Sequence, residues 1–102
     1  MAYKVRISAP TKEEARSISD LLIEEKLVSG TLITSGESRY HWDGSIEEQE
    51  YFNIHAYTIE DNKDEIIENV EDMHSDETPI IEFIEIEGNK KFLDWVSESV
   101  KD

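Results

Sequence analysis

The chain contains no cysteine, and only two prolines and four glycines occur among its 102 residues. Without cysteine the fold has no disulfides, no thiolate zinc site and no thiol nucleophile. The glycines are scattered and match no phosphate-binding loop, and the Gly-x-Ser-x-Gly pattern of serine hydrolases is missing. We therefore exclude nucleotide kinases and dinucleotide-dependent dehydrogenases, and we expect a protein that is not an enzyme.

Positive charge is also scarce. Ten Lys and Arg stand against 25 Asp and Glu, which gives a formal net charge of -15. Such a surface repels phosphate backbones and anionic lipids, so we expect neither a nucleic-acid partner nor a membrane partner. Cations, by contrast, are attracted to it even without a specific site.

Long apolar runs are absent as well. The first residues alternate apolar and polar side chains, as in a strand, and predict neither a signal peptide nor a membrane span. We expect a cytoplasmic protein with one domain over residues 1–102. A domain of this size buries a modest share of its surface, so association between copies could supply stability.

Hydrophobic periodicity predicts four strands and three helices. The predicted strands are 3–8, 31–35, 49–59 and 80–87, and the predicted helices are 11–26, 61–73 and 89–100. Thr11 and Glu14 have the spacing of a capping box, Asp61 is the expected cap of the second helix, and Asp43-Gly44 is expected to form a hairpin turn. The order β-α-β-β-α-β-α is typical of the α+β class, a ferredoxin-like split βαββαβ sandwich with an added C-terminal helix.

The third predicted strand indicates what each face of the sheet contacts. Phe52, Ile54 and Ala56 are expected to face the helices, while the opposite face carries Tyr51, Asn53, His55 and Tyr57. That second face is aromatic and hardly charged in a very acidic chain, so an interface is favoured over a solvated surface. In the last strand apolar residues alternate to both faces, Ile80, Ile84 and Ile86 on one and Ile81 and Phe83 on the other, which predicts partial cover on both sides.

Two motifs stand out between these elements. The segment Ser38-Arg39-Tyr40-His41-Trp42-Asp43-Gly44 fits the pattern Ser-x-Tyr-x-Trp-x-Gly, and His74, Glu77 and Pro79 fit most of His-x-Tyr-Glu-x-Pro. With these motifs the chain resembles the CutA family of divalent-cation-tolerance proteins over nearly its whole length.

The resemblance implies a homotrimer in which three sheets pack open face to open face, with Tyr51, Asn53, His55 and Tyr57 in or near the interface. It also implies an inter-subunit cleft lined by Tyr40, Trp42, His74, Glu77 and Pro79. In that cleft His74 and Glu77 are the candidate ligands of a divalent cation such as copper, and the family's role is binding without catalysis. His41, between the two aromatics, is expected to point to solvent.

Three positions depart from the family pattern. Asp76 stands where the family has Tyr, which makes the cleft more acidic. Gly30 takes the position of a common cysteine, so soft thiolate ligation of copper is impossible there. Tyr57 replaces a common lysine and removes a cation.

Two alternative functions remain open at this stage. One is a small-molecule sensor like the PII signalling trimers, which share the architecture, although Arg39 is the only cation of the hairpin. The other is a structural trimer without a specific ligand, in which Tyr40 and Trp42 only pack the hairpin and His74 is a capping or interface histidine.

Overall fold

The computed structural model describes residues 1–102, which form one four-stranded sheet and three α-helices. The strands are β1 (Ala2–Ala9), β2 (Thr31–Trp42), β3 (Ser45–Ile59) and β4 (Ile81–Ile86). The helices are α1 (Lys12–Glu24), α2 (Lys63–Met73) and α3 (Lys90–Ser99), and a 3₁₀ turn, η1 (Glu60–Asn62), precedes α2. This order is the predicted one, so the α+β split βαββαβ fold with a C-terminal helix is confirmed.

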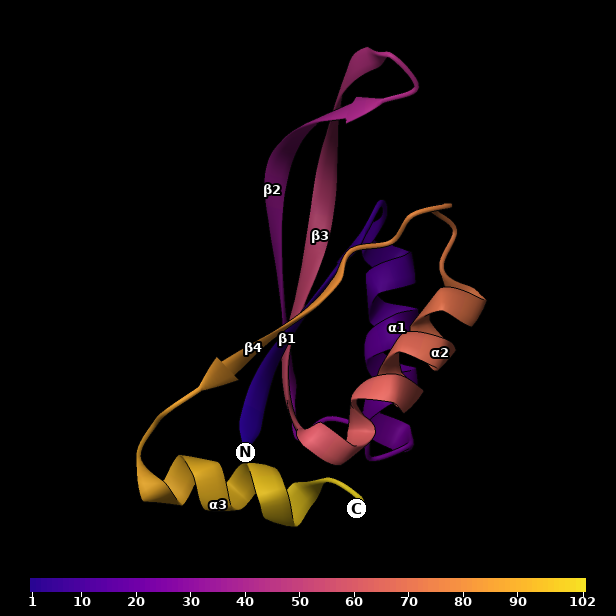
Figure 1. The fold of residues 1–102 in the computed structure, drawn as a ribbon. Coiled ribbons are helices and arrows are strands. Elements are labelled where there is room, and N and C mark those ends of the chain that lie inside the picture. The colour runs from indigo at the N-terminus through magenta and orange to yellow at the C-terminus, as the bar shows by residue number, and fades with distance from the viewer.

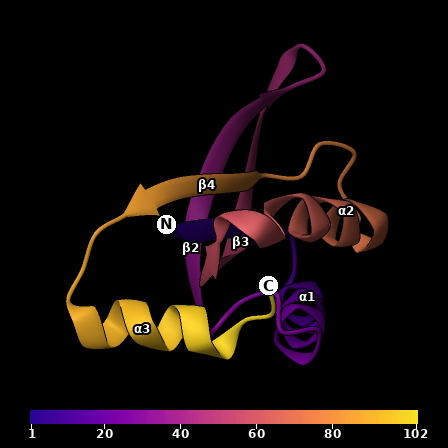
Figure 2. The same cartoon turned by 60° about the horizontal axis from the view of Figure 1, so that its bottom comes forward.

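The sheet has the strand order β2-β3-β1-β4, and all neighbouring strands are antiparallel. Helices α1 and α2 lie side by side on one face, and α3 crosses the end of the sheet (Figure 1). In the turned view α3 begins near the edge formed by β4 and ends beside α1 (Figure 2). Most of the second face, here called the open face, is therefore not covered by a helix of the same chain.

The core lies between the sheet and helices α1 and α2. Its largest fully buried side chains are Val5, Ile7, Ile18, Leu22, Leu27, Ile54, Ile66 and Val70. The strand residues among them have the parity of the helix-facing side, and those of α1 and α2 recur at helical spacing, as predicted. None of the helices has the length and the apolar character needed to cross a membrane.

The β2–β3 hairpin is longer than the sequence pattern predicts. The ladder runs without interruption from the pair Thr31 and Ala56 to the pair Trp42 and Ser45. Asp43 and Gly44 form the two-residue turn, and both have positive φ, 51° and 81°, as such hairpin turns require. The hairpin extends beyond the helices (Figure 1) and makes the molecule 44 Å long against 25 and 21 Å in the other directions.

Helix α1 begins and ends with capping interactions. The Thr11 hydroxyl accepts a hydrogen bond from the Glu14 amide, at 3.1 Å. At the other end Lys26 has φ 55°. The Lys26 amide donates a hydrogen bond to the Ile23 carbonyl, and the Leu27 amide donates to the Leu22 carbonyl. This is a Schellman motif with lysine at the left-handed position where glycine is usual.

The prediction that Asp61 caps α2 is wrong. Asp61 lies inside the turn η1, the capping position belongs to Asn62, and no side chain there bonds to the first amides of the helix. Asn62 is buried and donates its side-chain amide to the Lys101 carbonyl at 2.8 Å. The side chain that stands at the capping position is thus committed to a contact with a distant part of the chain.

The expectation for the last strand holds fully on one face and in part on the other. Ile81 and Phe83 pack against the core. On the open face Ile86 is half-buried, whereas Ile80 and Ile84 are 46% and 54% exposed. Helix α3 buries Val96 and holds the ring of Trp95 so close to Gly30 that a Cβ on Gly30 would lie 2.9 Å from it.

Candidate functional site

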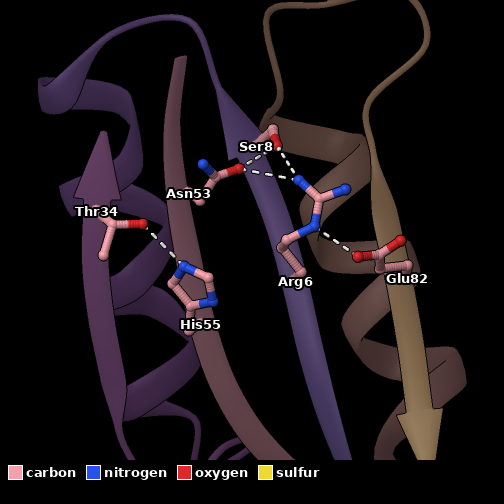
Figure 3. Close-up of polar contacts among 6 residues, drawn as sticks. All are labelled: Arg6, Ser8, Thr34, Asn53, His55 and Glu82. Atoms are coloured by element: carbon pink, nitrogen blue, oxygen red, sulfur yellow. Dashed lines mark hydrogen bonds and ion pairs between the residues drawn. The ribbon is translucent and has the colours of Figure 1, made fainter. Parts of the chain in front are cut away.

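A polar network spans three strands on the open face (Figure 3). The Arg6 guanidinium donates through Nε to Glu82 on β4 at 2.5 Å and through Nη1 to the Asn53 side-chain oxygen on β3 at 3.0 Å. The same Nη1 donates to the Ser8 hydroxyl at 3.1 Å, and that hydroxyl donates to Asn53 at 2.7 Å. Arg6 is therefore a fixed, partly buried cation on the open face.

His55 lies beside this network on β3. Its Nε2 is 2.8 Å from the Thr34 hydroxyl on β2 (Figure 3). Partial burial, and then the positive charges of Lys4 and Arg6, lower the pKa of His55 from its ordinary 6.5. The imidazole thus favours its neutral form, in which it keeps a hydrogen bond across the two strands.

A groove of about 780 Å³ opens between the hairpin and the loop that follows α2. Its aromatic lining comes from the hairpin, Tyr40 and Trp42 on β2 and Tyr51 on β3. Asp76 and Glu77 line it from the loop, and Arg6, Ser8 and Asn53 line it from the open face of the sheet. Tyr40, Trp42 and Glu77, three of the five predicted cleft residues, are therefore brought together in one groove.

His74 and Pro79 do not line this groove. The His74 side chain is fully buried, and both ring nitrogens are hydrogen bonded: the Asp76 amide donates to Nδ1 at 3.0 Å, and Nε2 is 2.6 Å from the Ser8 carbonyl oxygen. Since Nδ1 accepts, the proton is on Nε2. A metal ion could reach His74 only by breaking one of these two bonds.

Glu14 lies next to the same histidine. Its carboxylate is 3.4 Å from His74 Nδ1 and accepts a hydrogen bond from the Ser75 amide at 3.0 Å. Only the Thr11 half of the predicted capping box is therefore formed, because the Glu14 carboxylate bonds to the loop after α2 and not back to Thr11. Together Glu14 and His74 hold the loop that carries Asp76 and Glu77 into the groove.

Tyr51 connects that loop to the hairpin. Its hydroxyl donates to the Asp76 carboxylate at 2.9 Å, and its ring meets the ring of Tyr40 edge-on, with centroids 5.8 Å apart. Burial, and then the Tyr40 hydroxyl and the Asp76 carboxylate, raise the pKa of Tyr51 above its ordinary value. Asp76, which takes the place of a tyrosine in the family motif, is therefore a defined acceptor in this site.

The structure places the predicted interface residues on one face of β3. Tyr51, Asn53, His55 and Tyr57 are all half-buried there. Tyr57, however, already packs against the chain's own α3, where its ring meets Phe92 edge-on at 5.0 Å. His41 is exposed, as predicted, but it also lines the groove, where the sequence pattern did not place it.

Some groove residues were missed by sequence reasoning. Arg6 and Ser8 were treated only as the polar positions of a half-buried strand. Because β1 is an inner strand of the sheet and pairs with β3, those polar positions lie on the open face next to Asn53, 45 or more residues away in sequence. The alternation of polar and apolar residues along β1 could have revealed these groove residues, since Lys4, Arg6 and Ser8 are spaced two apart and therefore lie on the same face of the sheet.

No group of three or more His, Cys, Asp or Glu side chains in the structure is arranged to hold a metal ion. The geometry defines an α+β sandwich protein with an open sheet face and a groove formed by a long hairpin and the loop after α2.

Comparison with known proteins specifies the family. Residues 3–99 match the model of the family described as CutA1 divalent ion tolerance protein. The divalent-cation tolerance protein CutA of Archaeoglobus fulgidus is 39% identical over 98 residues, 95% of this chain and 96% of the relative. The corresponding protein of Thermus thermophilus is 33% identical over 101 residues, 97% of this chain and 98% of the relative.

A solved structure agrees with these sequence matches. The structure of the periplasmic divalent cation tolerance protein CutA from A. fulgidus superposes with a TM-score of 0.95 at 37% identity, covering 99% of this chain and all of the other. The chain belongs to the CutA1 divalent ion tolerance family.

Proposed function

We propose that this protein is a homotrimer that serves divalent-cation tolerance by binding cations, with copper as the candidate cation, and that it catalyses no reaction. The observation that carries the proposal is the family match over residues 3–99, combined with a sheet face that the chain's own helices leave open. The relatives' names state divalent-cation tolerance, and cation binding is the role that the resemblance to this family implies.

The open face supports the assembly part of the proposal. Leu32, Ile80 and Ile84 are 64%, 46% and 54% exposed there, although this face also carries the half-buried polar row of β3. Apolar side chains mixed with fixed polar groups are typical of interfaces between subunits. Three copies packed by this face would cover all of these side chains.

The cation part rests on fewer contacts. Glu77 is an exposed carboxylate in the groove, and His74, its proposed co-ligand, is held in two hydrogen bonds. This engagement of His74 favours a second candidate, a trimeric scaffold that attracts cations only through its charge of -15.

The decisive experiment combines sedimentation velocity with calorimetric titration of Cu(II), Zn(II) and Mg(II) at moderate salt. The main variant is Glu77→Gln, because Glu77 is exposed and we expect its substitution to leave the fold intact. Glu71→Gln, an exposed carboxylate on α2 outside the groove, is the matched control. His74→Gln is compared separately, with circular dichroism to verify folding.

We expect a trimeric mass and one saturable Cu(II) site per subunit that Glu77→Gln weakens and Glu71→Gln retains. Weak binding of all three metals that salt abolishes and both variants retain would support the scaffold instead. A monomeric mass at micromolar concentration would contradict the assembly.

We also propose a cytoplasmic location. The name of the A. fulgidus structure calls that relative periplasmic, so the compartment requires a direct measurement. Fractionation of the source cells, followed by immunodetection of the protein beside a periplasmic and a cytoplasmic marker, distinguishes the two.

A further inference from the structure

Charge is distributed unevenly between the surfaces of the molecule. Among the open-face side chains of β1 and their cross-strand neighbours on β3 and β4, the charged ones are Lys4, Arg6 and Glu82, and His55 favours its neutral form. This part of the open face thus has two cations against one carboxylate, in a chain with 25 acidic and ten basic residues. Glu82 is the one carboxylate on the surface by which the copies are proposed to pack.

Arg6 and Glu82 use only part of their hydrogen-bonding capacity within the chain. Arg6 donates through Nε to Glu82 Oε1 at 2.5 Å and through Nη1 to Ser8 and Asn53. Its other terminal nitrogen, Nη2, forms no hydrogen bond within the chain, and neither does the second carboxylate oxygen of Glu82, Oε2 (Figure 3). The two side chains are 32% and 43% exposed. One charged donor and one charged acceptor are therefore free at the surface.

Covering the open face removes these two atoms from water. Every buried side-chain nitrogen and oxygen of the single chain has a hydrogen-bond partner, and a charged group buried without one is costly. A free anion is a poor partner for Nη2, because the net charge of -15 repels it. In a three-fold ring, by contrast, different patches of adjacent copies meet, so a donor on one copy can face an acceptor on the next.

We propose that Arg6 and Glu82 join adjacent copies of the chain: Nη2 of Arg6 in one copy donates to Oε2 of Glu82 in the next, and three such contacts close the ring. The inference rests on the proposed trimer and names the polar contact that orients its copies. The Arg6 guanidinium is suited to this contact because Glu82, Ser8 and Asn53 of its own chain already hold it in place. Little side-chain freedom is then lost when the copies associate.

The first test measures how fast copies exchange between trimers, by native mass spectrometry after unlabelled and ¹⁵N-labelled protein are mixed. Glu82→Gln keeps one oxygen that accepts from Arg6 in its own chain but replaces the other with an amide that cannot accept. We expect exchange at least about tenfold faster, from the loss of a charge-assisted hydrogen bond. Glu85→Gln is the matched control, because Glu85 is an exposed residue of the same strand on the opposite face. Circular dichroism verifies the folding of both variants.

Charge reversal distinguishes a contact between copies from a contact within one chain. Arg6→Glu and Glu82→Arg each place like charges at these two positions, so each variant alone should form a weakened trimer. When the two variants are mixed, a contact between copies brings the introduced carboxylate to the introduced guanidinium. Mixed trimers should then exceed the share that random mixing gives. Repulsion within one chain cannot be relieved by mixing.

Three outcomes would overturn the proposed contact: exchange unchanged in Glu82→Gln, exchange equally fast in Glu85→Gln, or random mixing of the two reversed variants. With a wild-type trimer, each of these outcomes leaves the proposed assembly standing. A monomeric wild type would overturn the contact and the assembly together. The binding of Cu(II) is independent of all these results.

Discussion

His55 illustrates how a single residue depends on neighbours from two strands. Thr34 on β2 holds its Nε2, while Lys4 and Arg6 on β1 present positive charges to the same imidazole. Burial and like charge both disfavour the imidazolium, so the pKa of His55 is lowered in the folded protein. The sign of this shift determines how stability depends on pH.

We predict that His55 makes folding less favourable in mild acid. The unfolded chain takes up a proton near pH 6.5, whereas the folded chain does so only at lower pH, so protons bind first to the unfolded state. The contribution is fully present above pH 6.5 and is lost as the pH falls through the folded pKa. Denaturant unfolding between pH 8 and 5 should show a steeper loss of stability in the wild type than in His55→Gln.

An NMR titration of the imidazole provides an independent check of the same shift. A His55 resonance that titrated above pH 6.5 would contradict the prediction.

The candidate site was only partly predictable from single residues. Tyr40 and Trp42 could be assigned to one face because strand positions two apart share a side. His74 could not be interpreted in the same way, since its partners Ser8 and Asp76 bond through backbone groups that leave no trace in residue type. The role of Arg6 depends on Glu82 and Asn53, which only the strand order brings beside it.

Among the elements, α1 has a specific local cost. Lys26 occupies the left-handed conformation at the end of the helix, with φ 55°, where a side chain is disfavoured. Its backbone still makes the Schellman bonds and accepts a hydrogen bond from the Lys101 amide at 2.9 Å. The conformational cost therefore arises from the steric effect of the Lys26 Cβ and not from a missing hydrogen bond.

Replacing Lys26 with glycine should stabilise the protein. Glycine adopts this φ without steric cost, which outweighs its greater freedom in the unfolded chain, so we expect a gain of about 0.5–1 kcal/mol. The measurement is the free energy of unfolding in urea. Lys26→Ala is the control, because it removes the charge but keeps the Cβ, and a gain as large in Lys26→Ala would assign the effect to charge.

The elements also show where periodicity is insufficient. Element order was predictable because strands and helices differ in the spacing of their apolar residues, but the outer half of the hairpin has few apolar residues to reveal its ladder. Glu37 pairs with Glu50 and Arg39 with Glu48, and only the register shows that these charged residues are in strands. Asp61 was chosen as a cap by residue type, whereas the 3₁₀ turn places Asn62 at that position.

At the scale of the whole molecule, the two faces of the sheet differ in what they leave exposed. The face toward α1 and α2 is closed, while the open face exposes Leu32, Ile80 and Ile84. A comparable isoleucine, Ile23 on α1, is 42% exposed on the other side of the molecule. The chain thus offers a matched pair of positions with which to locate an interface.

We predict that Leu32→Glu dissociates the proposed trimer at micromolar concentration, while Ile23→Glu leaves it assembled. Burying a carboxylate among apolar side chains of three subunits costs several kcal/mol, and each copy would add one more negative charge to the same interface. Sedimentation velocity over a hundredfold range of concentration provides the measurement. Equal masses for the two variants would place the interface elsewhere.

The central place of β1 in the sheet has a consequence for how fast the chain folds. The β2–β3 hairpin closes around a two-residue turn. Ala2, by contrast, pairs with both Ile59 and Ile86, so the strand pairs that complete the sheet join residues from distant parts of the chain. Long loops must close before such pairs form, and proteins rich in distant pairs fold slowly. We therefore expect the hairpin to form early and the pairing of β1 with both β3 and β4 to set the folding rate.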